Sequence, residues 1–513
     1  MRSKNAFKNT LWGIVYEAIV LVCGFIVPRL VLTGFGSEYN GITSVIKQFL
    51  QVISLFQAGI GGVTIAALYK PLYERDRWQV SVIIKTTEVY LRKIAIIFIG
   101  AFALIAFILP LFVEEFDYFF TASLVLIMSL STFSQYFFGL TYRYLLSANQ
   151  HQRIIHIVNS INALANTAMS AILIYLGFSI HIVMLGSALV YFFSPVFIYV
   201  YVNKKYSLIK TVKPDNNVIK QRWDNFGSQV AAFITVNTDL IVLSVFSTMK
   251  IVSVYTVYNL IISGVLGLFN PFIAGVSAAF GNMIAKNEQV LLKKNIRLYE
   301  EVVYVLATFL FGSASAMILF FVELYTKNVS DSYIYSQSIF AYILIAATLF
   351  RIYRFPYTGI TDAAGHFKQN RNLSFVEAAI NIVVSVVLVI ILNDYYKLIG
   401  VAIGTLFAYS FRTIRFAVYM SKYLIPRSNR LFVKRILLSL LVTVIIASIP
   451  TILQFKKPES WLIWVIHAAV VSIIAFVLTL SVELIFYRND LKELFKMVKY
   501  VIKKSKPSSK LLN

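Results

Sequence analysis

The sequence predicts an all-α, polytopic membrane protein with fourteen transmembrane helices. Of its 513 residues, 59% are hydrophobic and only 14% are charged, with a mean hydropathy of +0.76, whereas soluble domains carry about 25% charged residues. The apolar residues gather in stretches long enough to cross a bilayer, which takes about 20 residues. Basic residues concentrate in alternate connecting segments, as they do in multi-pass membrane proteins. A water-soluble globular protein is therefore excluded.

The apolar stretches define fourteen predicted spans. The first follows a basic start and is too long for the core of a signal peptide, so we expect it to be retained. Fourteen crossings need about 280 residues, which leaves no room for a sizeable soluble catalytic domain. The predicted spans are 9–32, 41–67, 89–113, 119–145, 154–177, 181–202, 224–246, 252–281, 299–322, 335–357, 374–392, 398–420, 434–453 and 461–486.

The distribution of basic residues predicts the orientation. Of the 47 Lys and Arg, 33 lie in segments on the same side as the N-terminus and five lie on the opposite side. Because Lys and Arg are retained in cytoplasmic segments, we expect both termini to be cytoplasmic. The formal net charge of +24 is then a topology signal and does not indicate nucleic-acid binding. The five residues on the opposite side are Lys250, Lys327, Lys397, Lys456 and Lys457.

Short sequence elements recur at a nearly constant separation and predict two pseudo-symmetric six-helix lobes. The equivalent pairs are Tyr142–Tyr144 and Tyr353–Phe355, Asn162 and Asn381, and Gly186 and Gly404. Since each copy has an even number of crossings, both copies have the same topology and can enclose a cavity. The predicted parts are an N-terminal lobe (1–202), a cytoplasmic loop (203–223), a C-terminal lobe (224–421), two extra helices (434–486) and a basic amphipathic tail (487–513).

The second predicted span carries polar and small residues along one face. Ser44, Lys47 and Gln51 are three or four residues apart and therefore share that face. Inside a bilayer such a face must meet another helix or water. Tight packing through small residues would explain the glycines of this span, whereas Lys47 and Gln51 favour a water-filled lumen.

Ionisable residues within the spans are candidate site residues, because a charge there costs about 2.5–3.5 kcal/mol on insertion scales. Arg351 and Arg354 share a helix face, and so do Arg412 and Arg415. Paired guanidinium groups suit a phosphate or carboxylate, so we expect an anionic cargo. Arg143, Arg354 and Arg415 lie near inner helix ends and could instead snorkel to the interface. The predicted lumen cations are Arg29, Lys47, Arg143, Arg351, Arg354 and Arg412.

Three carboxylates also fall within the spans, namely Glu17, Asp239 and Glu377. Each could carry a coupling proton or sodium ion, or serve only as the counter-ion of a nearby arginine. The lone Cys23 and five unpaired histidines give no metal site. No GxxxxGK[ST] pattern occurs. We therefore expect no catalytic residues, no enzymatic activity and no cofactor.

Four segments carry a resemblance to a known family: Lys8–Trp12, Leu32–Gly41, Leu146–His151 and Ala363–Lys368. With them the chain resembles the Wzx-type flippases of polysaccharide repeat units, within the multidrug, oligosaccharidyl-lipid and polysaccharide exporter superfamily. The resemblance covers essentially the whole chain, although the motifs are degenerate. Fourteen helices fit this branch better than the twelve usual in drug exporters.

The resemblance implies transport of an undecaprenyl-pyrophosphate-linked oligosaccharide from the inner to the outer leaflet of the bacterial cytoplasmic membrane, by alternating access. The product would feed capsule, O-antigen or exopolysaccharide synthesis. By similarity, Lys47, Arg351 and Arg412 would be lumen cations, and helices thirteen and fourteen would guide the lipid tail. Implied partners are the lipid-linked oligosaccharide, membrane lipids, and polysaccharide polymerase and assembly proteins, with no nucleic acid.

Other functions remain open at this stage. A cation-coupled multidrug exporter of the same superfamily is the main alternative, followed by a lipid II flippase and a polysaccharide polymerase. The outer loops are short and offer few acidic residues to a polymerase. A scaffold without transport activity is a further possibility, and it would not depend on the lumen cations.

Overall fold

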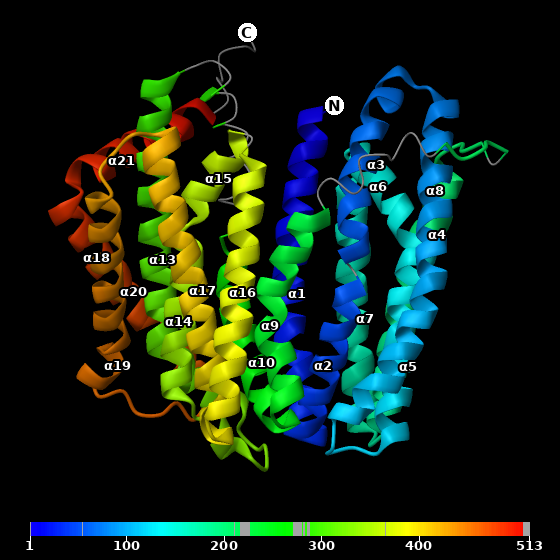
Figure 1. Cartoon of the computed structure of the whole chain (residues 1–513), viewed down its shortest axis with the longest axis horizontal. Coiled ribbons are helices and arrows are strands. Elements are labelled where there is room, and N and C mark those ends of the chain that lie inside the picture. Colours follow the sequence, from blue (N-terminus) through cyan, green and yellow to red (C-terminus); the bar gives the residue numbers. More distant parts are fainter. Residues whose placement is uncertain are drawn as a thin grey trace, which may run out of the picture. The chain divides into compact units, whose positions relative to one another are not determined.

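The structure of the chain is a computed structural model that describes residues 2–53, 55–209, 211–215, 226–269, 280, 283–284, 288–364 and 366–505, with only the backbone described at some of these positions. Throughout these ranges the regular elements are helices (Figure 1). The all-α prediction is therefore confirmed.

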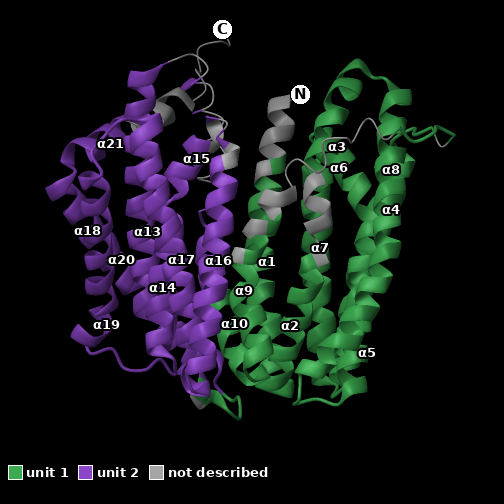
Figure 2. Ribbon diagram, in the orientation of Figure 1, with its two compact units in different colours: residues 1–260, 328–334 green, residues 261–327, 335–513 purple. Residues whose placement is uncertain are grey.

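Contacts divide the chain into two compact units (Figure 2). Unit 1 comprises residues 1–260 and 328–334, and unit 2 comprises residues 261–327 and 335–513. The described helix α9 and most of α10 thus belong to unit 1, although the predicted N-terminal lobe ends at residue 202. The lobes were predicted from a sequence repeat, whereas the units are defined by contacts between residues. The units therefore do not test the lobe boundaries, which stay a prediction.

Unit 1 is a bundle in which α1 packs against α7, α5 against α8, and α7 against α8. Helices α2 and α3 continue one another in sequence, and both contact α4 and α9. The helices are α1 (Arg2–Phe35), α2 (Ser37–Ile53), α3 (Leu55–Glu74), α4 (Arg77–Ile108), α5 (Tyr118–Ser134), α6 (Leu140–Ala148), α7 (Gln152–Tyr175), α8 (Ile180–Lys205), α9 (Phe226–Phe246) and, shared with unit 2, α10 (Met249–Gly267).

Unit 2 is organised around one long helix, α13, which packs against α14, α18, α20 and α21. Helix α17 packs against both α14 and α16. The helices are α13 (Gln289–Tyr325), α14 (Ser338–Tyr353), α15 (Phe355–Ala363), α16 (Phe367–Ile391), α17 (Lys397–Tyr419), α18 (Arg430–Ala447), α19 (Ile449–Ile452), α20 (Trp461–Phe486) and α21 (Arg488–Ser505).

Local sequence signals set several helix ends. Gly36 has φ +99° and turns the chain between α1 and α2, a conformation that costs glycine little. The Asp76 carboxylate accepts a hydrogen bond from Gln79 N at 2.9 Å at the start of α4. Asp117 does the same for Phe119 N at 3.0 Å at the start of α5. Each carboxylate accepts from an N–H that has no partner within the helix, and its negative charge interacts favourably with the positive N-terminal end of the helix dipole.

A π-helical turn, η2 (Gln135–Gly139), joins α5 to α6. It lies against α8, where a Cβ on Gly139 would come within 2.6 Å of Pro195 Cβ. Ser134 Oγ fixes the same contact by donating to Phe192 O at 2.7 Å. Single π turns re-aim the side chains around them and are frequent at functional sites.

Two glycines that the repeat pairs with each other occupy matching positions in the two units. A Cβ on Gly186 in α8 would lie 2.8 Å from Leu173 Cδ1 in α7. A Cβ on Gly404 in α17 would lie 2.9 Å from Ser385 N in α16. Both glycines thus allow a helix to approach the preceding helix closely.

Twelve of the described helices are long and apolar enough to cross a membrane, so the chain is a multi-pass membrane protein. The count of fourteen is not confirmed. Residue 54, inside the second predicted span, lies outside the described residues, and α2 and α3 stand on either side of it. In the seventh predicted span α9 is helical, and Val236–Phe246 counts as a shorter apolar helix among the described residues. Of the predicted eighth span, residues 270–279 and 281 lie outside the described residues, as do the loop residues 216–225 and the tail residues 506–513.

Candidate functional site

Unit 1 contains two adjoining cavities of about 510 and 290 Å³. They share Lys47, Ser131, Gln135, Met184, Ser187 and Tyr191 in their walls. The walls come from α1, α2, α5 to α8 and the π turn η2. The larger volume lies within the range of about 300–1,000 Å³ that small-ligand sites occupy.

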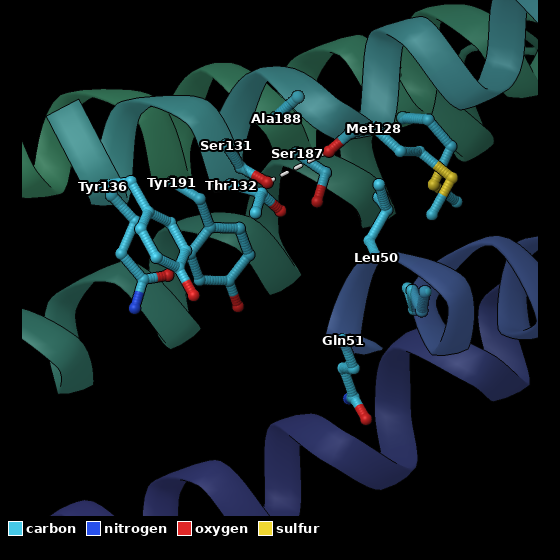
Figure 3. Close-up of a pocket in the computed structure, with 12 residues that line it drawn as sticks. Leu50, Gln51, Met128, Ser131, Thr132, Tyr136, Ser187, Ala188 and Tyr191 are labelled. Carbon is cyan, nitrogen blue, oxygen red and sulfur yellow. Dashed lines mark hydrogen bonds between the residues drawn. The ribbon is translucent and has the colours of Figure 1, made fainter. Parts of the chain in front are cut away.

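Figure 3 shows the smaller cavity. Hydroxyl groups of Ser131, Thr132 and Ser187 lie on the side of the rings of Tyr136 and Tyr191, and Leu50 of α2 points toward them from across the cavity. Ser131 Oγ is held in place by donating to Met128 O at 3.1 Å. This cavity therefore combines hydroxyl groups with aromatic surfaces.

Lys47 and Arg143 carry the positive charge of these walls. Lys47 lines both cavities from α2, and its side chain is exposed to them. Arg143 lines the larger cavity from α6, and its Nη2 donates to Asn159 Oδ1 at 3.2 Å. Among the described residues neither cation has an acidic partner within ion-pair distance. Two of the predicted lumen cations, Lys47 and Arg143, thus line the same cavity, the larger one.

No carboxylate occurs among the described residues that line either cavity. Three buried polar atoms in the wall of the larger cavity also have no hydrogen-bond partner within the described part of the chain: Arg143 Nε, Asn166 Oδ1 and Ser194 Oγ. Buried polar groups are nearly always paired. These atoms can therefore bind polar groups of a ligand, and the net field of the wall favours an anion.

Sequence reasoning missed a row of polar residues on α7. Asn159, Asn162, Asn166 and Ser170 are three or four residues apart, and all four line the larger cavity. Their spacing could have revealed this row, because it is the same helical spacing of polar residues that identified the polar face of the second span. Asn162 was used only as a landmark of the repeat. The row adds amide groups to the site, which can both donate and accept hydrogen bonds.

The corresponding arginine of unit 2 is in a different environment. Arg354 and Arg412 both donate to the Glu377 carboxylate, which is completely buried. Arg412 Nη2 also donates to Asn370 Oδ1 at 2.8 Å. Glu377 is thus the counter-ion of two predicted lumen cations in this structure.

The predicted repeat brings Asn159 close to the position of Glu377, although its landmark pairs differ in separation by a few residues. Asn159 and Glu377 are 218 residues apart, the same separation as Gly186 and Gly404. Arg143 thus contacts an amide in unit 1, and Arg354, with which the repeat pairs it, contacts a carboxylate in unit 2. Ser194, at the same separation from Arg412, lines the larger cavity.

The remaining predicted site residues do not line the two cavities. Arg29 is half-buried in α1, and Glu17 is exposed in the same helix. Arg351 is half-buried in α14, with its guanidinium carbon 5.9 Å from the centre of the Tyr409 ring. Asp239 is buried in α9 and accepts a hydrogen bond from Tyr255 Oη at 3.3 Å.

A second group of charges joins α13, α18 and α21 in unit 2. Arg427 donates to both oxygens of Glu300. Arg435 Nη2 lies 2.9 Å from both Glu301 and Asp490. Sequence reasoning did not select Glu300 and Glu301, although both lie at the start of the predicted span 299–322. Within the described ranges, no group of three or more His, Cys, Asp or Glu residues is arranged to hold a metal ion.

Comparison with solved structures identifies the fold. The lipid II flippase MurJ in an inward closed conformation matches with a TM-score of 0.68 and 16% identity, over 94% of this chain and 99% of that one. An inward-facing multidrug resistance MATE family transporter of the MOP superfamily matches with a TM-score of 0.57 and 14% identity, over 81% of this chain and 96% of that one. A MOP superfamily transporter from Pyrococcus furiosus, described as having a binding pocket of reverse polarity, matches with a TM-score of 0.54 and 13% identity. This match covers 83% of this chain and 95% of that one.

Neither a scan against protein-family models nor a search of curated proteins returned a match. The chain therefore shares the fold of MOP superfamily transporters at low sequence identity.

Proposed function

We propose that this chain is a membrane transporter that moves an undecaprenyl-pyrophosphate-linked oligosaccharide from the inner to the outer leaflet of a bacterial cytoplasmic membrane by alternating access. The observation that carries the proposal is the charge of the unit 1 cavities. Lys47 and Arg143 line them, and no described residue in their walls is acidic. Two cations without acidic partners inside a membrane protein are costly, and an anionic cargo would compensate them.

The chemistry of the walls fits a head group that contains both phosphate and sugar. Lys47 and Arg143 would receive phosphate oxygens, for which ammonium and guanidinium groups are suited. The amides of Asn162 and Asn166 can hydrogen-bond sugar hydroxyl groups, and the Tyr191 ring offers an apolar face against which a sugar can pack.

The comparison with MurJ supports a lipid-linked substrate. That flippase covers 94% of this chain, whereas the MATE and Pyrococcus structures reported above cover 81% and 83%. A lipid II flippase is consequently a second candidate function. It requires the same recognition of pyrophosphate and sugar, so the cavity alone does not separate the two substrates.

A cation-coupled multidrug exporter is the third candidate. A pocket for cationic drugs would be expected to present acidic groups, because binding surfaces complement the charge of their ligands. The described walls of these cavities present the opposite charge. Polymerase and assembly proteins would be functional partners of a repeat-unit flippase, and proton or sodium coupling would supply its driving force.

Deletion of the chain from its host tests the three candidates together. A repeat-unit flippase predicts loss of surface polysaccharide, accumulation of lipid-linked repeat units on the inner leaflet and unchanged resistance to cationic dyes. Cell lysis with inner-leaflet accumulation of lipid II would instead establish the lipid II candidate. Loss of dye resistance with normal polysaccharide would establish the drug exporter and overturn the proposal.

A further inference from the structure

A third cavity, of about 450 Å³, lies in unit 2 where α13, α18, α20 and α21 meet. Four arginines line it: Arg297, Arg427, Arg435 and Arg488. Two carboxylates, Glu300 and Asp490, are also in its wall. The described lining therefore carries a surplus of positive charge.

Both carboxylates are already held by arginines. Glu300 accepts two hydrogen bonds from Arg427, and Asp490 is paired with Arg297 and Arg435. Arg488 is exposed at the start of α21 and forms no ion pair with any described residue. Its charge is therefore available to a ligand.

Three atoms in this lining have unused hydrogen-bonding capacity within the described part of the chain. Arg435 is only 6% exposed, and its Nη1 has no hydrogen-bond partner and lies 3.8 Å from Glu300 Oε2. Arg427 Nε and Tyr487 Oη are buried, and neither finds an acceptor for its proton within the described part of the chain, although Arg435 lies beside the Tyr487 oxygen. Burial raises the pKa of Tyr487, so its hydroxyl stays a donor at physiological pH. Unused donors of this kind fit the oxygens of a phosphate.

The rest of the lining is apolar and faces outward. Leu431, Ile485 and Phe486 line the cavity and are exposed on the surface of α18 and α20. Lys434 Nζ lies 4.8 Å from the centre of the Phe486 ring, which adds a cation beside this apolar rim. A cationic pocket that opens beside exposed apolar residues at the end of a spanning helix suits a molecule with a phosphate and an acyl chain.

We propose that this cavity binds the phosphate of an anionic phospholipid head group from the leaflet on the C-terminal side of the chain. The phosphate lies among Arg427 Nε, Arg435 Nη1 and Tyr487 Oη, Arg488 closes it from the solvent side, and the acyl chains follow Ile485 and Phe486. The bound lipid would link α21 to α18 and α20. This proposal does not depend on the function of the unit 1 cavities.

Native mass spectrometry of the purified full-length protein, titrated with dioleoylphosphatidylglycerol or dioleoylphosphatidylcholine, tests it. We expect one phosphatidylglycerol to be retained in preference to phosphatidylcholine. Tyr487→Phe removes one hydroxyl without changing the charge, and Arg488→Gln removes an exposed charge, so both variants should fold. Each should weaken retention by about fivefold, or about 1 kcal/mol, because Tyr487→Phe removes one hydrogen bond and Arg488→Gln removes one charged contact at the membrane surface.

Lys492→Gln is the matched control, because Lys492 is exposed on the same helix and does not line the cavity. It should retain the lipid as the wild type does. Equal losses in Lys492→Gln and Arg488→Gln, with none in Tyr487→Phe, would show general attraction to a basic helix and overturn the site. Displacement of the lipid by millimolar inorganic phosphate would show that the cavity takes the free ion, which also overturns the lipid assignment.

Discussion

Arg143 donates to Asn159 in unit 1 through a hydrogen bond of 3.2 Å between Nη2 and Oδ1. At the equivalent position of unit 2, Arg354 is paired with the Glu377 carboxylate. An amide orients a guanidinium without cancelling its charge, whereas a carboxylate cancels it. Arg143 therefore keeps its full charge in the cavity wall of unit 1, whereas in unit 2 Arg354 and Arg412 share one carboxylate.

Asn159→Glu should convert the first environment into the second. The new carboxylate would pair with Arg143 and remove much of the positive charge of the cavity, so we expect transport to fall at least about tenfold while the protein folds normally. The measurement is surface polysaccharide, normalised to the amount of folded protein. Asn159→Gln keeps an amide and serves as the control. Wild-type output from Asn159→Glu would contradict an anionic cargo at this site.

Lys47→Glu should likewise abolish surface polysaccharide. Lys47 is the cation that the described walls of the two cavities share, and the substitution reverses its charge. Lys47→Arg should retain most of the activity. The control is Lys70→Glu, since Lys70 is an exposed residue of α3, 3.9 Å from Glu74. A protein that acts only as a scaffold would tolerate both charge reversals, so unchanged polysaccharide in Lys47→Glu rejects transport through this cavity.

Glu377→Gln should destabilise the protein by about 3–5 kcal/mol, because it leaves Arg354 and Arg412 buried without a counter-ion. Thermal unfolding of the purified protein measures the effect. Adding Arg412→Gln removes one of the two charges and should recover part of the loss. Glu323→Gln is the comparison, since Glu323 pairs with Lys457 at the surface and should cost less than about 1 kcal/mol. Equal costs would mean that the cluster contributes little.

Gly404→Ala should destabilise unit 2 by about 1–3 kcal/mol, since the added Cβ would lie 2.9 Å from Ser385 N and force α16 and α17 apart. Gly100→Ala is the control, because a Cβ added at Gly100 in α4 would meet nothing within 4 Å. It should stay within about 1 kcal/mol of the wild type. The unfolding midpoints of the two variants are compared. A lower midpoint in Gly404→Ala alone assigns the loss of stability to the contact with Ser385, whereas equal midpoints assign no stability to that contact.

Stability should fall as the pH is lowered from about 7.5 to about 5.5. Burial, followed by the nearby Lys205 and Arg153, lowers the pKa of His151 below its ordinary 6.5. Above that value the side chain is neutral whether or not the chain is folded. Below it the unfolded chain takes up the proton more readily, which favours unfolding. Neutral His151 lies 2.9 Å from Tyr206 Oη through Nδ1.

The check is the unfolding midpoint as a function of pH for the wild type and His151→Gln. The variant lacks the titrating group, so its midpoint should fall less over this interval. Identical slopes would assign the pH dependence to other groups. Carboxylates with ordinary pKa values near 4 remain ionised throughout the interval and do not interfere.

The sequence by itself determined the class of the protein, most of its helices, and which residues deserved attention as charges inside apolar helices. These properties are local, since the cost of placing a side chain in lipid depends on that side chain and its immediate neighbours. Lys47 and Arg143 could be selected in this way because each interrupts an apolar segment.

The tertiary structure decided which of these charges are compensated. Glu377 pairs with arginines 23 and 35 residues away along the chain, and only the packing of α14, α16 and α17 brings the three together. Arg143 meets an asparagine instead, because α6 and α7 place Asn159 beside it. Ion pairing requires contact within a few ångströms, and helical periodicity fixes a residue's face on its own helix but leaves open which helix it will face.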